Sequence, residues 1–160
     1  MIQAIKEAVL AGLQSLAVPG GLCDGLTAFS DSEVDTQPTA NSPMFQIKFL
    51  SEVPPTELQG IGAGATHFET AITYLAQIKT TAPQPQAARD LYNLWYRRDT
   101  VTGNLTGVKI AINQLLATGL VLSTNDRFRV DASEMRRGLP HPPYTDVLEI
   151  RLTFTNGFNG

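Results

Sequence analysis

The chain has 160 residues and a mass of 17.3 kDa, the usual size of one folded domain, so we expect a single domain over residues 1–160. Hydrophobic residues make up 42% and charged residues 17%, which excludes wholesale disorder and favours a surface that partners cover. The net charge of −3 excludes a dedicated DNA-binding protein, because such a protein needs a basic excess to neutralise phosphates.

The scarce residue types narrow the function classes further. A single cysteine, Cys23, excludes an intramolecular disulfide, and two histidines leave little for a zinc site. No apolar run approaches the roughly 20 residues that cross a bilayer, so we expect no membrane partner. The amphipathic N-terminus does not read as a signal peptide, and we expect assembly in a cytoplasm.

The first predicted element is a helix over residues 2–16. Its apolar residues recur at spacings of three and four and share one face: Ile2, Ile5, Val9, Leu13 and Leu16. Lys6 falls off this stripe, and Pro19 and the glycines after it end the helix. Residues 19–43 read as an extended loop with at most a short strand around residues 22–29.

Two alternating segments predict a long hairpin. Residues 44–50 form the first strand, residues 51–65 a glycine-rich connection, and residues 66–79 a long second strand. On the second strand, the pattern puts Ile72 and Tyr74 on the core face and Gln77 and Lys79 on a wet face.

The rest of the chain predicts two helices and further strands. Helices are expected over residues 87–98 and 104–117, a strand pair over 120–122 and 128–130, an extended loop over 132–144, and a closing strand over 146–155. This order predicts an α+β fold, in which helices cover one face of an antiparallel or mixed sheet with a long β-hairpin.

No group of residues forms a recognisable catalytic or cofactor site. Gly60, Gly62 and Gly64 lie before a strand rather than before a helix, so they do not form a phosphate loop. Cys23 has no partnered histidine, and His67 and His141 lack metal-ligand spacing. We expect no catalytic residue, metal or cofactor. A small enzyme with a site built from Asp24, His67 and Glu69 stays open as an alternative.

Two sets of residues are candidates for contact with other proteins. The first set is the connection of the hairpin, a projecting loop that can order on docking: Glu52, Glu57, Gly60, Ile61, Gly62, Ala63 and Gly64. The second set combines outward aromatic residues with two arginine pairs and predicts a subunit interface: Tyr92, Tyr96, Arg97, Arg98, Arg136 and Arg137. For the arginines, the alternatives are a cationic helix end over residues 97–98 and a solvated loop over residues 136–137.

The order of these elements resembles the tail terminator proteins of long-tailed bacteriophages. That layout has an N-terminal amphipathic helix, a strand, a long hairpin strand, a helical segment and a closing strand pair. The matching stretches here are residues 2–16, 44–50, 67–79, 89–117, and 127–130 with 147–154. The resemblance covers nearly the whole chain and rests on element order, length and strand pattern.

The resemblance implies a structural virion protein without catalytic residues. Such a protein forms a homo-oligomer, a hexameric ring, on the last ring of the tail tube protein. The ring stops tube polymerisation and joins the tail to connector or stopper proteins of the neck. By position, residues 51–65 would face the tube, and a genome could pass through the lumen without sequence-specific contact. The alternative is another neck protein, either a stopper or a head-completion protein, or the cap of a contractile injection system.

Overall fold

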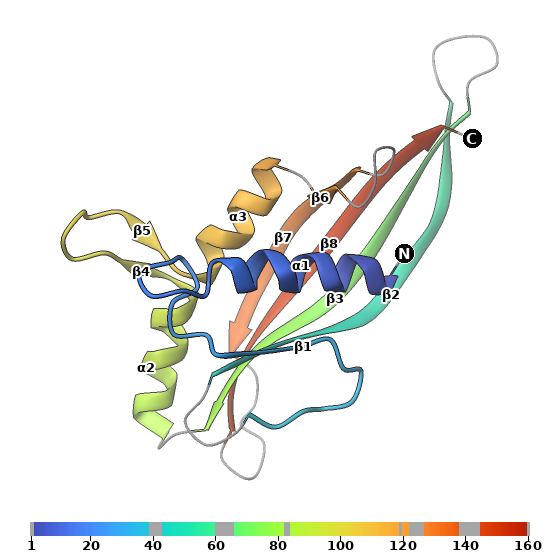
Figure 1. Cartoon of the computed structure of the whole chain (residues 1–160). Coiled ribbons are helices and arrows are strands. Elements are labelled where there is room, and N and C mark those ends of the chain that lie inside the picture. The colour runs from blue at the N-terminus through green and yellow to red at the C-terminus, as the bar shows by residue number, and fades with distance from the viewer. Residues whose placement is uncertain are drawn as a thin grey trace.

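The computed structural model describes residues 2–38, 43–59, 66–81, 84–118, 120–121, 127–137 and 145–159. The described residues contain three helices and eight strands, which follow one another as α1 (Ile2–Ser15), β1 (Ala28–Ser30), β2 (Met44–Gln59), β3 (Thr66–Thr81), α2 (Gln84–Trp95), β4 (Arg97–Arg98), β5 (Leu105–Thr106), α3 (Val108–Thr118), β6 (Leu120–Val121), β7 (Arg127–Arg137) and β8 (Thr145–Asn159). Figure 1 shows the helices packed beside a strongly twisted sheet.

The main sheet has the strand order β1-β2-β3-β8-β7-β6. The pairing of β1 with β2 is parallel and all other pairings are antiparallel, so the sheet is mixed. The predicted α+β class is confirmed, and so is the long hairpin, which β2 and β3 form along their whole length.

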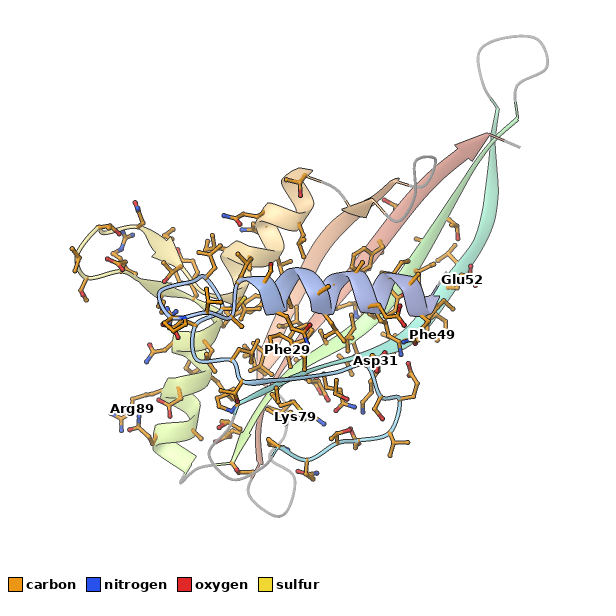
Figure 2. The ribbon with its side chains drawn as sticks, in the orientation of Figure 1. Phe29, Asp31, Phe49, Glu52, Lys79 and Arg89 are labelled. Carbon is orange, nitrogen blue, oxygen red and sulfur yellow. The ribbon has the colours of Figure 1, made fainter. Side chains whose placement is uncertain are left out.

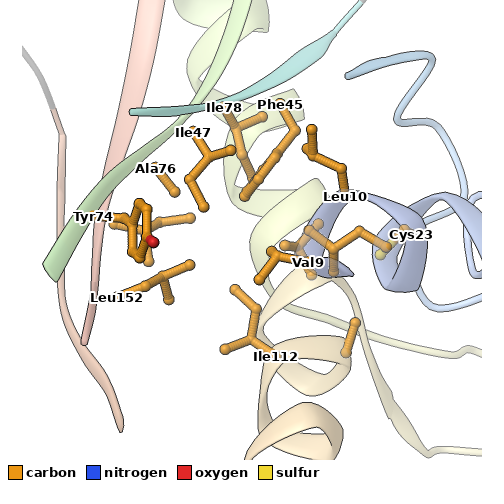
Figure 3. Packing of buried hydrophobic residues seen from close by; sticks show 14 of the residues in the cluster. Val9, Leu10, Cys23, Phe45, Ile47, Tyr74, Ala76, Ile78, Ile112 and Leu152 are labelled. Atoms are coloured by element: carbon orange, nitrogen blue, oxygen red, sulfur yellow. The ribbon is translucent and has the colours of Figure 1, made fainter. Parts of the chain in front are cut away.

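The core lies between one face of the sheet and the helices (Figure 3). On β3 and β8 the apolar residues stand opposite one another in rows, which are Ile72 with Phe154, Tyr74 with Leu152, Ala76 with Ile150, and Ile78 with Leu148. Every residue of these rows is buried, as the alternation of the two strands predicts. The Tyr74 hydroxyl keeps a polar partner, because it donates a 3.0 Å hydrogen bond to the Ile2 carbonyl oxygen at the start of α1.

Each helix contributes its predicted apolar stripe to this core. The buried stripe residues are Ile5, Val9 and Leu13 of α1, Leu91, Leu94 and Trp95 of α2, and Val108, Ala111 and Ile112 of α3. Because all of them belong to one cluster with the apolar face of β3 and β8, the three helices cover the same face of the sheet.

Several predicted boundaries are wrong. β2 does not end at residue 50 but continues to Gln59, and β7 continues through residues 132–137, which read as loop. α2 spans Gln84–Trp95 instead of residues 87–98, and α3 begins at Val108 instead of residue 104. Between these helices the chain forms the short hairpin of β4 and β5, which was not predicted.

Candidate interaction surfaces

The β2–β3 hairpin is an arm that extends beyond the helical layer (Figure 1). Its pairing runs from Met44 opposite Lys79 to Gln59 opposite Thr66. Glu52 is exposed on this arm. Of Glu57 only the backbone is described, and it pairs with Phe68. The other residues predicted for the connection lie outside the described residues: Gly60, Ile61, Gly62, Ala63 and Gly64.

Strand β2 continues through two prolines, which lie at one of two irregular points of its pairing with β3. The register with β3 shifts between Phe49 and Ser51 and again between Val53 and Thr56, where Pro54 and Pro55 lie. Proline has no N–H for a ladder, so it is tolerated at a bulge or on an edge strand. Beside β2, the only strand on the side away from β3 among the described residues is the short β1. The arm therefore keeps its strand pairing where the sequence predicts a loop.

An acidic segment, residues 31–36, lies along the edge of β2 after β1 ends. The Glu33 carboxylate accepts a 3.2 Å hydrogen bond from the Phe49 N–H. The Gln46 side chain donates through Nε2 to the carbonyl oxygens of Ser32 and Val34, each at 2.7 Å. These bonds fix the segment to the edge strand, on the side of the molecule where Figure 2 labels Asp31 and Phe49.

Three lysines bind the acidic segment from beneath. Lys6 pairs with Glu33 and donates a 2.7 Å hydrogen bond to the Asp31 carbonyl oxygen. Asp35 pairs with Lys48 and, at 3.2 Å between Oδ1 and Nζ, with Lys79. Lys79 Nζ also lies 2.9 Å from Gln46 Oε1.

This arrangement corrects two predictions about exposure. Lys6 is buried although it lies off the stripe of α1, and Gln77 and Lys79 are buried although alternation puts them on a wet face. A buried ammonium group needs a charged partner. The acidic segment supplies one for Lys6 and for Lys79, and Gln77 Nε2 donates to Glu149 Oε1 at 3.4 Å.

The lysines set the ionisation of the segment. Hydrogen bonds from Lys48 and Lys79 lower the pKa of Asp35 below its ordinary value. For Glu33, partial burial acts to raise the pKa, but hydrogen bonds from Lys6 and from the Phe49 N–H outweigh it and the pKa is lowered. Both groups are therefore carboxylates throughout the neutral range.

A second surface lies on α2 and on the turn that follows it. Trp95 faces the core while Tyr92 and Tyr96 are exposed, as the helical pattern predicts. Lys109 of α3 holds its ammonium group 5.6 Å from the centre of the Tyr96 ring, a cation–π contact. The side therefore exposes two tyrosine rings next to a cationic group, and tyrosine is enriched at protein interfaces.

The arginine pair beside this surface is not the cationic helix end that the sequence allowed. Arg97 and Arg98 form β4, because α2 ends at Trp95. Arg97 donates to the carbonyl oxygens of Asp24 and Gly21 at 3.2 and 3.4 Å, and through Nε to the Thr106 hydroxyl at 3.1 Å. Arg97 thus joins the turn after α1 to the β4–β5 hairpin, whereas the side chain of Arg98 is exposed.

The second arginine pair lies in a strand rather than in a solvated loop. Arg136 and Arg137 belong to β7, where they stand opposite Glu149 and Leu148 of β8. Only their backbone is described. The strand was not predicted here because the residues are polar and show no alternating apolar pattern. It is held by backbone pairing with β8.

The residues of the enzymatic alternative are not brought together. The Asp24 carboxylate accepts a 3.0 Å hydrogen bond from the Gly20 N–H in the turn after α1. His67 and Glu69 belong to the beginning of β3, which Figure 1 places at the opposite end of the molecule from that turn. Cys23 is buried, and burial raises the pKa of its thiol to about 11 even though Arg97 lowers it, so the thiol is not a nucleophile at neutral pH.

The described part of the chain contains no cluster of histidine, cysteine and carboxylate residues suited to a metal ion. Within the same residues, no helix is long and apolar enough to cross a membrane. No protein-family model matches the chain, and no curated protein is significantly similar to it.

Proposed function

We propose that this chain is a structural virion protein of the tail-terminator class. In this role it forms a ring on the end of the tail tube of a long-tailed bacteriophage, stops tube polymerisation and offers the opposite side to connector or stopper proteins of the neck. The β2–β3 arm carries the proposal, because the outer part of this hairpin of two 16-residue strands, with the end of β8 beside it, extends beyond the helical layer and can reach past the boundary of one subunit.

Physical reasons support an assembly protein over an enzyme. A ring needs two different contact surfaces on each subunit, and the described residues expose apolar side chains both around the end of α2 and along β2. The low charged fraction of 17% suits a surface that neighbours cover. Assembly would take place in the host cytoplasm, with the protein ending in the tail or neck of the virion.

Native mass spectrometry of the chain, alone and mixed with tail-tube subunits, tests the proposal. We expect a closed ring, of six copies by the family resemblance, that binds the end of the tube assembly. A chain that ignores tube subunits but captures portal or adaptor protein would replace the proposal with a neck protein. A chain that captures neither would overturn both.

A further inference from the structure

We propose that two copies of this chain bind each other head to tail through two defined surfaces. The aromatic surface, formed by Tyr92, Tyr96 and Val101, contacts the acid-rimmed surface of the next copy, formed by Val34, Leu50 and Val53. The inference deepens the proposed ring-forming function by naming the faces that meet, and it is tested on the chain alone.

Exposed apolar side chains mark both surfaces. Among the described residues, seven large hydrophobic side chains are exposed, and six of them belong to these two groups; the seventh is Val18. Val101 and Val34 are the most open, at 92% and 75% of their full accessible area. Tyr92 and Tyr96 are one helical turn apart, since the Tyr96 N–H donates to the Tyr92 carbonyl oxygen, while Leu50 and Val53 lie on the same strand, to which Gln46 binds the Val34 carbonyl oxygen. Exposed apolar groups that are neighbours favour an interaction site.

The charges around the two surfaces are complementary. Arg98 and Lys109 are exposed beside the aromatic surface, and the nearby Asp99 carboxylate is occupied by backbone N–H groups of the turn. On the other side, the carboxylates of Glu33 and Asp35 point outward, with 55% and 69% of their side chains exposed. Their lysine partners lie largely beneath them, and Glu52 adds a further exposed carboxylate. Such rims fix the orientation of an encounter and reject the like surface.

Helix α1 separates the two surfaces. Its beginning touches the acidic segment through Lys6, and the turn that follows its end is held by Arg97 beside the aromatic surface. A helix of 14 residues is about 20 Å long. Figure 2 likewise places Glu52 and Arg89 at opposite sides of the molecule. The two surfaces of one copy are therefore too far apart to contact each other. When the aromatic surface of one copy contacts the acid-rimmed surface of the next, the assembly is heterologous and can close into a ring.

Val101 is presented on a turn whose shape is already fixed. The Asp99 carboxylate accepts hydrogen bonds from the N–H groups of Val101 and Thr102, at 2.8 and 2.7 Å. The Gly103 N–H donates to the Asp99 carbonyl oxygen at 2.9 Å, and Arg98 donates to the Gly103 carbonyl oxygen at 2.6 Å. A turn that is ordered before binding loses little conformational entropy when it docks.

Sedimentation of the chain alone, over a range of concentrations, tests the contact. We expect Val101→Asp and Val53→Asp each to raise the dissociation constant of self-association by about tenfold or more, since each puts a charge into an interface core. Val18→Asp is the matched control and should leave self-association unchanged. The inference is overturned if all three variants behave alike, or if the unmodified chain stays monomeric at every attainable concentration.

Two charge reversals test the head-to-tail arrangement without touching the apolar residues. Arg98→Glu makes the basic rim of the aromatic surface acidic, so that it meets the acidic rim of the next copy. Glu52→Lys makes the acidic rim more basic, so that it meets the basic rim of the next copy. Each variant should therefore associate more weakly alone. Mixed together, or combined in one chain, they should recover association, because unlike rims then meet. Absence of recovery overturns the pairing of these surfaces. If recovery occurs and the assembly ignores tube subunits, the contact stands and only the proposed function fails.

Discussion

Gly107 lies where two backbone segments of the helical layer approach each other closely. Its φ is +106°, and a Cβ added there would lie 2.7 Å from the Trp95 carbonyl oxygen, at the end of α2. We expect Gly107→Ala to lower the free energy of unfolding by about 3 kcal/mol, because the substitution combines an unfavourable φ with a backbone clash. Denaturant titration of the purified variant measures this loss.

Gly103→Ala separates the two causes. Gly103 also has a positive φ, of +72°, but an added Cβ would meet nothing within 4 Å. Only the conformational cost remains, and we expect a loss of about 1 kcal/mol. Equal losses for both variants would contradict a role for the contact with Trp95.

Single residues differ in how far the sequence reveals their surroundings. The exposure of Tyr92 and the burial of Trp95 follow from the 3.6-residue period alone. The burial of Lys6 does not, because its partner Glu33 lies 27 residues away and is brought to α1 by the tertiary fold. Acidic residues at every second position from Asp31 to Asp35 are the one local signal of that contact.

Whole elements were predicted best where one face is uniformly apolar. β8 and α1 satisfy this condition, and their patterns alone place them. β2 and β7 do not: prolines interrupt the outer half of β2, and the end of β7 is rich in charge. Both extensions are held by hydrogen bonds to the next long strand of the chain, β3 for β2 and β8 for β7, and no alternating apolar pattern encodes this pairing.

The acidic segment is held by groups that titrate below neutral pH. Asp35 has a lowered pKa in the folded chain, so its contribution to stability is present above the ordinary carboxyl pKa of about 4 and is lost as the pH falls through the lower folded value. We expect Asp35→Asn to lower the free energy of unfolding at pH 7 by about 1 kcal/mol, a small effect because solvent screens this largely exposed carboxylate.

The same variant should also flatten the dependence of stability on pH. Denaturant titrations between pH 7 and pH 3 compare Asp35→Asn with the unmodified chain, and the difference between the two should narrow as the pH falls, because Asp35 then begins to take up a proton and loses its ion pairs. Glu52→Gln, which removes an exposed carboxylate from the adjoining strand, is the control. A difference that is the same at every pH would show that the amide disturbs packing and that the charge is not the cause.

At the scale of the whole molecule, the sequence indicates the kinds of interaction residues but not their partners. Tyr92 and Tyr96 were predicted as interface, yet Val34, Leu50 and Val53 were not, because residues 31–36 come to lie beside the edge of β2 only in the folded chain. The sequence also predicts the same interface role for Arg97 and Arg98. The structure separates them, since Arg97 holds two turns together and Arg98 is exposed.

The proposed function predicts that the end of the arm contacts the tube while the body of the subunit forms the ring. Because Gln59 stands opposite Thr66, the six residues between them can be replaced by a two-residue Asn-Gly turn that suits a hairpin of this register. We expect this variant to keep self-association and to lose tube binding by about tenfold or more, since anchors near the centre of a contact dominate its affinity. A six-residue Gly-Ser replacement keeps the length of the connection but removes its side chains, so comparing the two variants by capture on immobilised tube subunits separates reach from chemistry. If both variants bind the tube as the unmodified chain does, the arm is not the tube contact, and the surface that faces the tube must lie on the body of the subunit.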